Sequence, residues 1–165
     1  MRSYGVGIEI ERKFLVRDRS VLDGSTGVAY RQGYLSRDPD RTVRVRIAGG
    51  RGFLTIKGRS EGASRVEFEY DIPALEAEQL LALCEGAIIE KTRHRIEHGG
   101  LTWEVDVFSG ANQGLLVAEV ELPSPDVSVD IPAWVGDEVT SDSRYFNANL
   151  VAHPWMEWGD DPAPA

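Results

Sequence analysis

Apolar and polar residues alternate with a period of two along most of the chain. This alternation is typical of β-strands, because successive side chains point to opposite faces of a sheet. A parallel crossover needs a dozen or more residues, so the short, turn-rich connections between these segments favour antiparallel pairing. The pattern predicts eight strands near residues 7–16, 28–36, 41–48, 52–58, 64–71, 87–97, 101–107 and 115–122.

Two segments break the alternation and favour short helices. After Pro73, apolar residues recur at helical spacing as far as Cys84, and we expect Gly86 at the position that follows the helix end. Residues 142–151 are expected to form a second short helix with Asp142 as its N-cap. The predicted fold class is therefore α+β, mainly β, with few helices.

The domain organisation is expected to be simple. The chain of 165 residues is long enough for one domain with a substantial core, and it shows no internal repeat and no linker. The proline-rich stretch 123–135 is interpreted as a loop. We therefore predict a single domain over residues 1–158 and a disordered tail over residues 159–165.

Composition excludes some classes of binding partner and favours one cellular compartment. A formal net charge of −9 argues against binding to nucleic acid and to anionic membranes. Cys84 is the single cysteine, so no internal disulfide can form, which is typical of a reducing cytoplasm. The amino terminus lacks the apolar run of a signal peptide, and no later segment resembles a membrane span. A cytoplasmic location is expected.

Charges of like sign repeat two residues apart in nearly every predicted strand. Glu9 and Glu11 share one strand face, as do Arg44 and Arg46. Such side chains lie ~7 Å apart, and like charges that close repel, so a sheet built only for stability would more often mix signs. A wet sheet face explains any one strand, but the repetition favours a functional site. The same spacing relates Glu67 to Glu69, Lys91 to Arg93 and Arg95, Glu104 to Asp106, and Glu119 to Glu121.

These patches fit a site that holds metal ions and a polyanion together. Mg²⁺ and Mn²⁺ prefer carboxylate and water oxygens, and Arg and Lys side chains neutralise the several charges of a triphosphate. Closing the sheet into a barrel would turn the charged face inward and leave the apolar face to be covered from outside. Stability alone gives no reason for that arrangement, because buried unpaired charge is expensive.

Residues 9–16, Glu-Ile-Glu-Arg-Lys-Phe-Leu-Val, resemble the ExExK opening of the CYTH superfamily, also called the triphosphate tunnel metalloenzymes. An ordered set of further segments carries the resemblance over about residues 7–151, and the short bacterial branch of inorganic triphosphatases is the most similar. These segments are Arg31–Leu35, Arg44–Arg46, Leu54–Lys57, Arg65–Tyr70, Ile89–Arg93, Val105–Phe108, Ala118–Leu122, Glu138–Thr140 and Arg144–Asn147.

The resemblance implies an eight-stranded antiparallel β-barrel that forms a tunnel, with a few flanking helices. It implies Mg²⁺- or Mn²⁺-dependent hydrolysis of a small-molecule triphosphate, foremost inorganic triphosphate to pyrophosphate and phosphate, and it allows a homodimer. A class IV adenylyl cyclase and a thiamine triphosphatase with Trp103 or Tyr34 as a platform stay open. A non-catalytic polyphosphate- or nucleotide-binding module also stays open, although it could dispense with the paired carboxylates present here.

The resemblance also assigns roles residue by residue. Lys91 and Tyr34 match a lysine–tyrosine pair in which lysine helps to activate water and tyrosine orients it; Tyr34 could equally be a wall aromatic. Glu67 and Glu69 fall on the tunnel face, where roles as ligands of the metal or of water, or in positioning a base, stay open. The implied metal ligands are Glu9, Glu11, Asp106, Glu119 and Glu121. The implied phosphate-binding residues are Lys13, Arg44, Arg46, Lys57, Arg93 and, more loosely, Arg144.

Three further charged residues are expected away from the reacting groups. Arg12 occupies the opposite face of the first strand and is expected in solvent outside the barrel. Arg95 is expected to form a structural ion pair, and Glu104 is expected to be a surface or rim charge.

Overall fold

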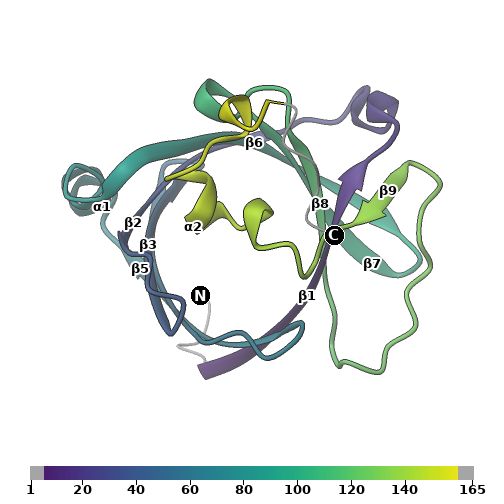
Figure 1. Ribbon diagram of the computed structural model, residues 1–165, viewed down its shortest axis with the longest axis horizontal. Coiled ribbons are helices and arrows are strands. Elements are labelled where there is room, and N and C mark those ends of the chain that lie inside the picture. The colour runs from purple at the N-terminus through teal and green to yellow at the C-terminus, as the bar shows by residue number, and fades with distance from the viewer. Residues whose placement is uncertain (1–5, 160–165) are drawn as a thin grey trace.

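Eight antiparallel strands close into a β-barrel in the computed structural model, which describes residues 6–159 (Figure 1). The order around the barrel is β5-β4-β3-β2-β6-β7-β8-β1, and pairing of β5 with β1 closes the ring. The predicted barrel is confirmed, and each predicted strand is present within two residues of its expected ends. The strands are β1 (Val6–Val16), β2 (Val28–Ser36), β3 (Arg41–Ala48), β4 (Arg51–Gly58), β5 (Ser64–Ile72), β6 (Glu85–His98), β7 (Leu101–Phe108), β8 (Leu116–Glu121) and β9 (Val135–Glu138).

Strand β1 is the closing strand of the barrel and pairs with three others. Its first half pairs with β5, and its second half pairs with β8, where Glu11 lies opposite Glu121 and Lys13 lies opposite Glu119. The short strand β9 adds to the carboxyl end of β1, with Phe14 opposite Glu138. The alternation pattern does not predict β9, since four residues directly after a proline-rich loop give too little periodicity.

Helix α1 (Ala74–Leu81) covers the outer face of β2, β3 and β4 and lies outside the ring in Figure 1. Its Ala77 and Leu81 pack with Val45 of β3. Gly52 of β4 permits this close approach, because a Cβ atom there would lie 2.8 Å from the Cβ atom of Ala77. The helix ends at Leu81, so the expectation that Gly86 follows its end is wrong. Gly86 instead belongs to β6 and has a φ of 69°.

The loop after β8 covers the outer face of β1, β7 and β8 in place of a helix. Phe14 and Trp103 project outward from the barrel, with ring centroids 5.5 Å apart, and Trp134 of the loop packs edge-on against Trp103 at 5.7 Å. Trp103 is fully buried in this outer core. The alternative in which Trp103 is a platform for a thiamine group is therefore wrong.

The carboxyl-terminal segment enters the ring and fills one end of its interior (Figure 1). The expected helix over 142–151 is divided, because Phe146 is extended (φ −67°, ψ 131°). The pieces are η3 (Ser143–Tyr145), which Asp142 caps, and α2 (Asn147–Leu150), followed by η4 (Trp155–Glu157). With inward-facing barrel residues they form the apolar plug, defined as Tyr34, Ile89, Phe108, Leu115, Val117, Val139, Tyr145, Leu150, Val151 and Trp158.

Two short 3₁₀ helices complete the described elements: η1 (Arg19–Leu22) and η2 (Gly110–Asn112). Residues 160–165, most of the predicted tail, lie outside the described residues, as do residues 1–5. Between residues 6 and 159, no helix combines the length and the apolar character needed to cross a membrane.

Candidate active site

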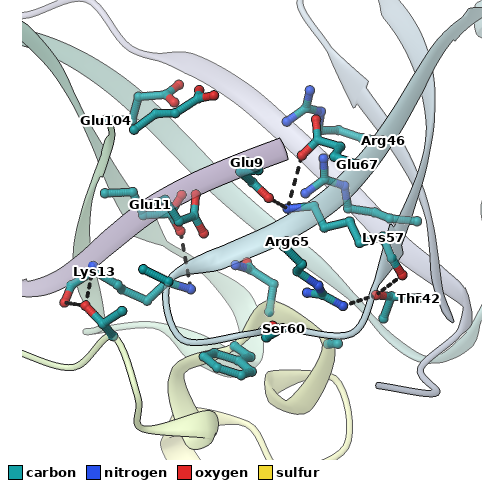
Figure 2. Close-up of a pocket in the computed structure, with 18 of the residues that line it drawn as sticks. Glu9, Glu11, Lys13, Thr42, Arg46, Lys57, Ser60, Arg65, Glu67 and Glu104 are labelled. Carbon is teal, nitrogen blue, oxygen red and sulfur yellow. Dashed lines mark hydrogen bonds and ion pairs between the residues drawn. The ribbon is translucent and has the colours of Figure 1, made fainter. Parts of the chain in front are cut away.

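A cavity of about 480 Å³ continues from the apolar plug along the inner face of the barrel (Figure 2). Every one of the eight barrel strands contributes lining side chains, and α2 contributes to its wall at the plug end. Of the described residues, nine basic and seven acidic ones line it: Lys13, Arg44, Arg46, Lys57, Arg59, Arg65, Lys91, Arg93, Arg95, Glu9, Glu11, Glu67, Glu69, Glu104, Glu119 and Glu121. The inward charged face expected from the alternation is therefore present.

One side of the cavity is basic: its cations come from β3 and β6, and β2 between these strands contributes Tyr30 and Tyr34. Arg46 lies with its guanidinium carbon 5.2 Å from the ring centre of Tyr30 and 5.1 Å from that of Phe53. Its Nη2 atom is 3.4 Å from Glu69, and Arg44 donates from Nη2 to Thr55 at 3.2 Å. Burial and the neighbouring Arg44 lower the pKa of Arg46 to about 10. This side therefore carries crowded positive charge that an anion would stabilise.

The opposite side is acidic and is built from the adjacent strands β1 and β8. Glu11 and Glu121 are direct cross-strand neighbours, and Glu9 and Glu119 lie on the same inner faces. Burial, followed by repulsion from Glu119 and Glu9, raises the pKa of Glu11 to about 8. Burial, followed by repulsion from Glu9, Glu11 and Glu104, also raises the pKa of Glu121. The raised pKa values show that the neighbouring lysines neutralise only part of the negative charge of these four glutamates.

Two lysines separate the acidic side chains from one another. Lys57 Nζ lies 2.7 Å from Glu9 and 3.5 Å from Glu67. Lys13 is buried, and its Nζ lies 3.4 Å from Glu119 Oε1 and 3.4 Å from the carbonyl oxygen of Tyr145. Burial alone would lower both lysine pKa values, but the neighbouring glutamates outweigh it and raise them. Both lysines are therefore cations at neutral pH.

Asp106 of β7 forms ion pairs with two of the basic lining residues, Lys91 and Arg93. It is fully buried, and its Oδ2 accepts from Lys91 Nζ at 2.7 Å and from Arg93 Nη2 at 2.8 Å, while Oδ1 accepts from Arg93 Nε at 2.7 Å. Burial would raise the pKa of Asp106, but Arg93 and Lys91 hold it well below its usual range. Asp106 is not one of the lining residues. Asp106 therefore acts as a counter-ion to Lys91 and Arg93. This role differs from the role of metal ligand that the family resemblance implies for it.

Lys91 lies where the charged cavity meets the apolar plug. Its Nζ is 5.5 Å from the ring centre of Phe108, and it donates to Asn147 Oδ1 of α2 at 3.3 Å. Burial outweighs the attraction of Asp106 and lowers the pKa of Lys91 to about 8. Tyr34 also lines the cavity at the plug, opposite Arg44 in register. The predicted lysine and tyrosine therefore belong to the same end of the cavity.

Arg144 lies away from the cavity, so the structure does not place it with the other predicted phosphate-binding residues. It borders a separate depression of about 400 Å³ beside Trp155. Its Nη2 lies 2.7 Å from Asp142, and its guanidinium carbon lies 4.9 Å from the ring centre of Trp158. The loose match of Arg144 to the family pattern could not predict this position, because the position depends on how the carboxyl-terminal segment folds back onto the barrel.

Several lining residues were outside the predicted set. Arg65 donates to the Gly58 carbonyl oxygen at 2.7 Å and to Thr42 Oγ1, and burial lowers its pKa. The period of two does contain the signal for Arg65, which shares the inner face of β5 with Glu67 and Glu69. Arg95 and Glu104 also line the cavity, and Glu104 is half-buried there, so its expected place at the rim stays a prediction. Asn147 has no comparable signal, because its position depends on the folding of α2 into the ring.

The acidic cluster fits a hard divalent cation in its chemistry. Its donors are all carboxylates, and the raised pKa of Glu11 marks negative charge that a cation would neutralise. Among residues 6–159, no three His, Cys, Asp or Glu side chains already stand in a common metal-binding arrangement. Mg²⁺ usually takes only one or two carboxylates and completes its shell with water and substrate phosphates, so the paired carboxylates suit it.

Comparisons with known proteins agree on one family. The family model for the CYTH domain matches residues 7–154. The chain is 49% identical to an inorganic triphosphatase of Acetivibrio thermocellus, over 93% of this chain and 99% of the relative. It is 41% identical to an inorganic triphosphatase of Nitrosomonas europaea, over 87% of this chain and 96% of the relative. It resembles the crystal structure of the inorganic triphosphatase NE1496 with a TM-score of 0.63 at 38% identity, over 86% of this chain and 96% of that one.

Proposed function

The chain belongs to the CYTH domain family, and from this premise we propose that it is a divalent-metal-dependent triphosphatase that hydrolyses inorganic triphosphate to pyrophosphate and phosphate. The observation that carries the proposal is the cavity, in which an acidic side on β1 and β8 faces a basic side on β3 and β6. The relatives named above are inorganic triphosphatases, which does not favour the cyclase, thiamine triphosphatase or binding-module alternatives.

The basic side chains would bind the phosphate chain. Arginine forks and lysine ammonium groups neutralise phosphate oxygens and hold the chain in one orientation. Several present contacts are long enough to be exchanged, such as the 3.4 Å approach of Arg46 to Glu69. We assign phosphate binding to Lys13, Arg44, Arg46, Lys57 and Arg93; Arg144 stays a prediction from the sequence.

The acidic side chains would hold the metal. Triphosphatases of this family depend on metal ions in general, and the choice of Mg²⁺ or Mn²⁺ is part of our proposal. The bound ion would stabilise negative charge on phosphate oxygens. Its ligands would come from Glu9, Glu11, Glu119 and Glu121, whereas Asp106 is better placed to hold Lys91 and Arg93. The roles of Glu67 and Glu69 stay undefined.

The reaction needs water to attack the terminal phosphorus. The new P–O bond forms as the bond to the bridging oxygen breaks, and pyrophosphate leaves. Lys91 has a pKa of about 8, so near neutral pH a share of the side chain is a neutral amine that can take the proton of water. Asp106 and Asn147 fix the position of its Nζ, and the Tyr34 hydroxyl would orient the water. Arg93 and Lys57 would neutralise the leaving group.

The test is a comparison of substrates and metals. We expect phosphate and pyrophosphate release from tripolyphosphate to exceed release from ATP and from thiamine triphosphate, in Mg²⁺ or Mn²⁺ and not in EDTA. Equal turnover with EDTA would remove the metal from the mechanism. Cyclic AMP produced from ATP would identify a cyclase, and binding of tripolyphosphate without turnover would identify a binding module.

Four expectations from the sequence stay predictions. They are the single domain over residues 1–158, the cytoplasmic location, the absence of nucleic-acid and membrane binding, and the homodimer.

A further inference from the structure

Gln32, at the centre of β2, is a fully buried amide without hydrogen-bond partners. Its exposed fraction is zero, and among residues 6–159 neither Nε2 nor Oε1 has a partner. A buried polar group that is left unpaired has lost its hydrogen bonds to water without replacement, which destabilises the folded state. Native structures contain few such groups, and each one calls for a physical explanation.

The register of the barrel places this amide beside a phosphate-binding arginine. Gln32 lies on the inner face of β2 between Tyr30 and Tyr34, and Arg46 of β3 is its direct cross-strand neighbour. Side chains at such positions have Cβ atoms about 5 Å apart. The Nε of Arg46 is also buried, and within the described part of the chain it too has no partner. An unused acceptor and an unused donor therefore occupy neighbouring positions.

The present contacts of Arg46 explain why the two groups do not meet. Its Nη2 approaches Glu69 at 3.4 Å, and the rings of Tyr30 and Phe53 lie close to its guanidinium group. A phosphate group in the cavity would compete with Glu69 for the Nη atoms. Guanidinium is planar, so a change in the direction of its Nη atoms also turns the Nε–H bond.

We propose that Gln32 is a positioning residue for substrate binding: when tripolyphosphate occupies the cavity, Gln32 Oε1 accepts a hydrogen bond from Arg46 Nε and fixes the guanidinium toward the phosphate. The inference rests on the proposed function. It explains why β2 retains a polar side chain where an apolar one would be more stable in the ligand-free protein. A site residue of this kind trades stability for binding.

The amide therefore makes opposite contributions to stability and to binding. In Gln32→Met, the unpaired polar atoms are gone and the shape is nearly kept, so the ligand-free protein should melt at the same or a higher temperature. The same change should raise the KM for tripolyphosphate about 10-fold, the size expected for a hydrogen bond to a charged group, while kcat changes less than about twofold. Gln79→Met, at an exposed position of α1, is the matched control and should change neither quantity.

A double-mutant cycle isolates the partner of the amide. Arg46→Lys keeps a positive charge but removes Nε, so adding Gln32→Met to it should raise KM little further. In Arg44→Lys, the effect of Gln32→Met should persist. Equal effects in the two backgrounds would show that Gln32 does not act through Arg46.

The remaining outcomes separate this inference from the proposed function. If wild type hydrolyses tripolyphosphate and Gln32→Met has the wild-type KM, only the inference fails. If wild type neither binds nor hydrolyses tripolyphosphate, the proposed function fails and the inference falls with it. If Gln32→Met and Gln32→Leu both fail to fold, the amide serves the fold, and the positioning role is overturned.

Discussion

The barrel interior contains two regions, the apolar plug and the charged cavity, which are built from the same strands. On β6, Ile89 belongs to the plug and Lys91, two residues later, belongs to the cavity. On β8, Val117 and Glu119 make the same change. The period of two directs all four side chains inward, so strand geometry does not distinguish the regions. The carboxyl-terminal segment does, because it covers one end with apolar side chains and leaves the rest of the interior to charges.

The two regions have opposite energetic roles. Burial of Leu150 and Val151 in the plug contributes stability through the removal of apolar surface from water. The cavity concentrates like charges, as the raised pKa of Glu11 and the lowered pKa of Arg46 show. The stability that the plug contributes therefore offsets the repulsion between like charges in the cavity. This arrangement is expected of a preorganised site.

The largest expected effect is loss of activity from the cavity without loss of the fold. Glu119→Gln keeps the shape of a side chain that lies between Lys13 and Arg93 but removes its charge. We expect kcat to fall on the order of 10²–10³-fold, with a wild-type circular dichroism spectrum. Glu138→Gln, whose partner is Arg12 on the barrel exterior, is the control and should keep activity within about twofold. An active Glu119→Gln variant would contradict the role of Glu119 as a metal ligand.

The converse variant weakens the plug. Leu150 is fully buried, so Leu150→Ala should lower the free energy of unfolding by about 3 kcal/mol in urea titrations. Leu83→Ala, at a position that is 71% exposed, should lower it by less than about 0.5 kcal/mol. We expect the folded fraction of Leu150→Ala to retain more activity than Glu119→Gln. A loss of stability no larger than that of Leu83→Ala would show that the plug does not stabilise the barrel.

A smaller effect follows from the charge on Glu11. Its pKa is raised in the folded protein from about 4.5 to about 8, so between these pH values the folded state binds more protons than the unfolded state. Stability in EDTA should therefore fall as pH rises through this window. In Glu11→Gln, this fall in the free energy of unfolding should be smaller by about 1–2 kcal/mol. The difference is less than the full pKa shift would give, because Glu11 is partly exposed to the cavity.

Urea unfolding of both proteins at pH 5 and pH 8 measures this difference, and Mg²⁺ at pH 8 should stabilise wild type more than Glu11→Gln. Identical pH dependence in the two proteins would show that Glu11 is not the strained carboxylate.

The smallest effect is expected at Arg144, which the family resemblance groups with the phosphate-binding residues but the structure places beside Trp158. Arg144→Gln should change the KM for tripolyphosphate less than about twofold, whereas Arg44→Gln should raise it about 10-fold or more. Steady-state kinetics of both variants checks the comparison. A similar rise in the two would support the assignment from the sequence and would require the carboxyl-terminal segment to move when substrate binds.

The strands and their inward faces could be predicted because both depend on local periodicity. Glu9, Glu11 and Lys13 share a face for this reason alone, and the structure brings all three to the cavity. Features that depend on distant parts of the chain were not predictable in this way. The counter-ion position of Asp106 needs the register of β7 on β6, and the plug needs the return of residues 139–158 into the ring.

Closure of the barrel through β1 also determines when the site exists during folding. Glu9 and Glu11 come from the beginning of the chain, whereas Glu119 and Glu121 of the neighbouring strand β8 lie more than a hundred residues later. Contacts of such high sequence separation form late, after the cost of closing the loop has been met. A nascent or truncated chain that ends before β8 can form the hairpins from β2 to β5 but not the acidic cluster. On the proposed assignment of these four glutamates, a divalent cation would have its site only in the closed barrel and would stabilise that state by binding it.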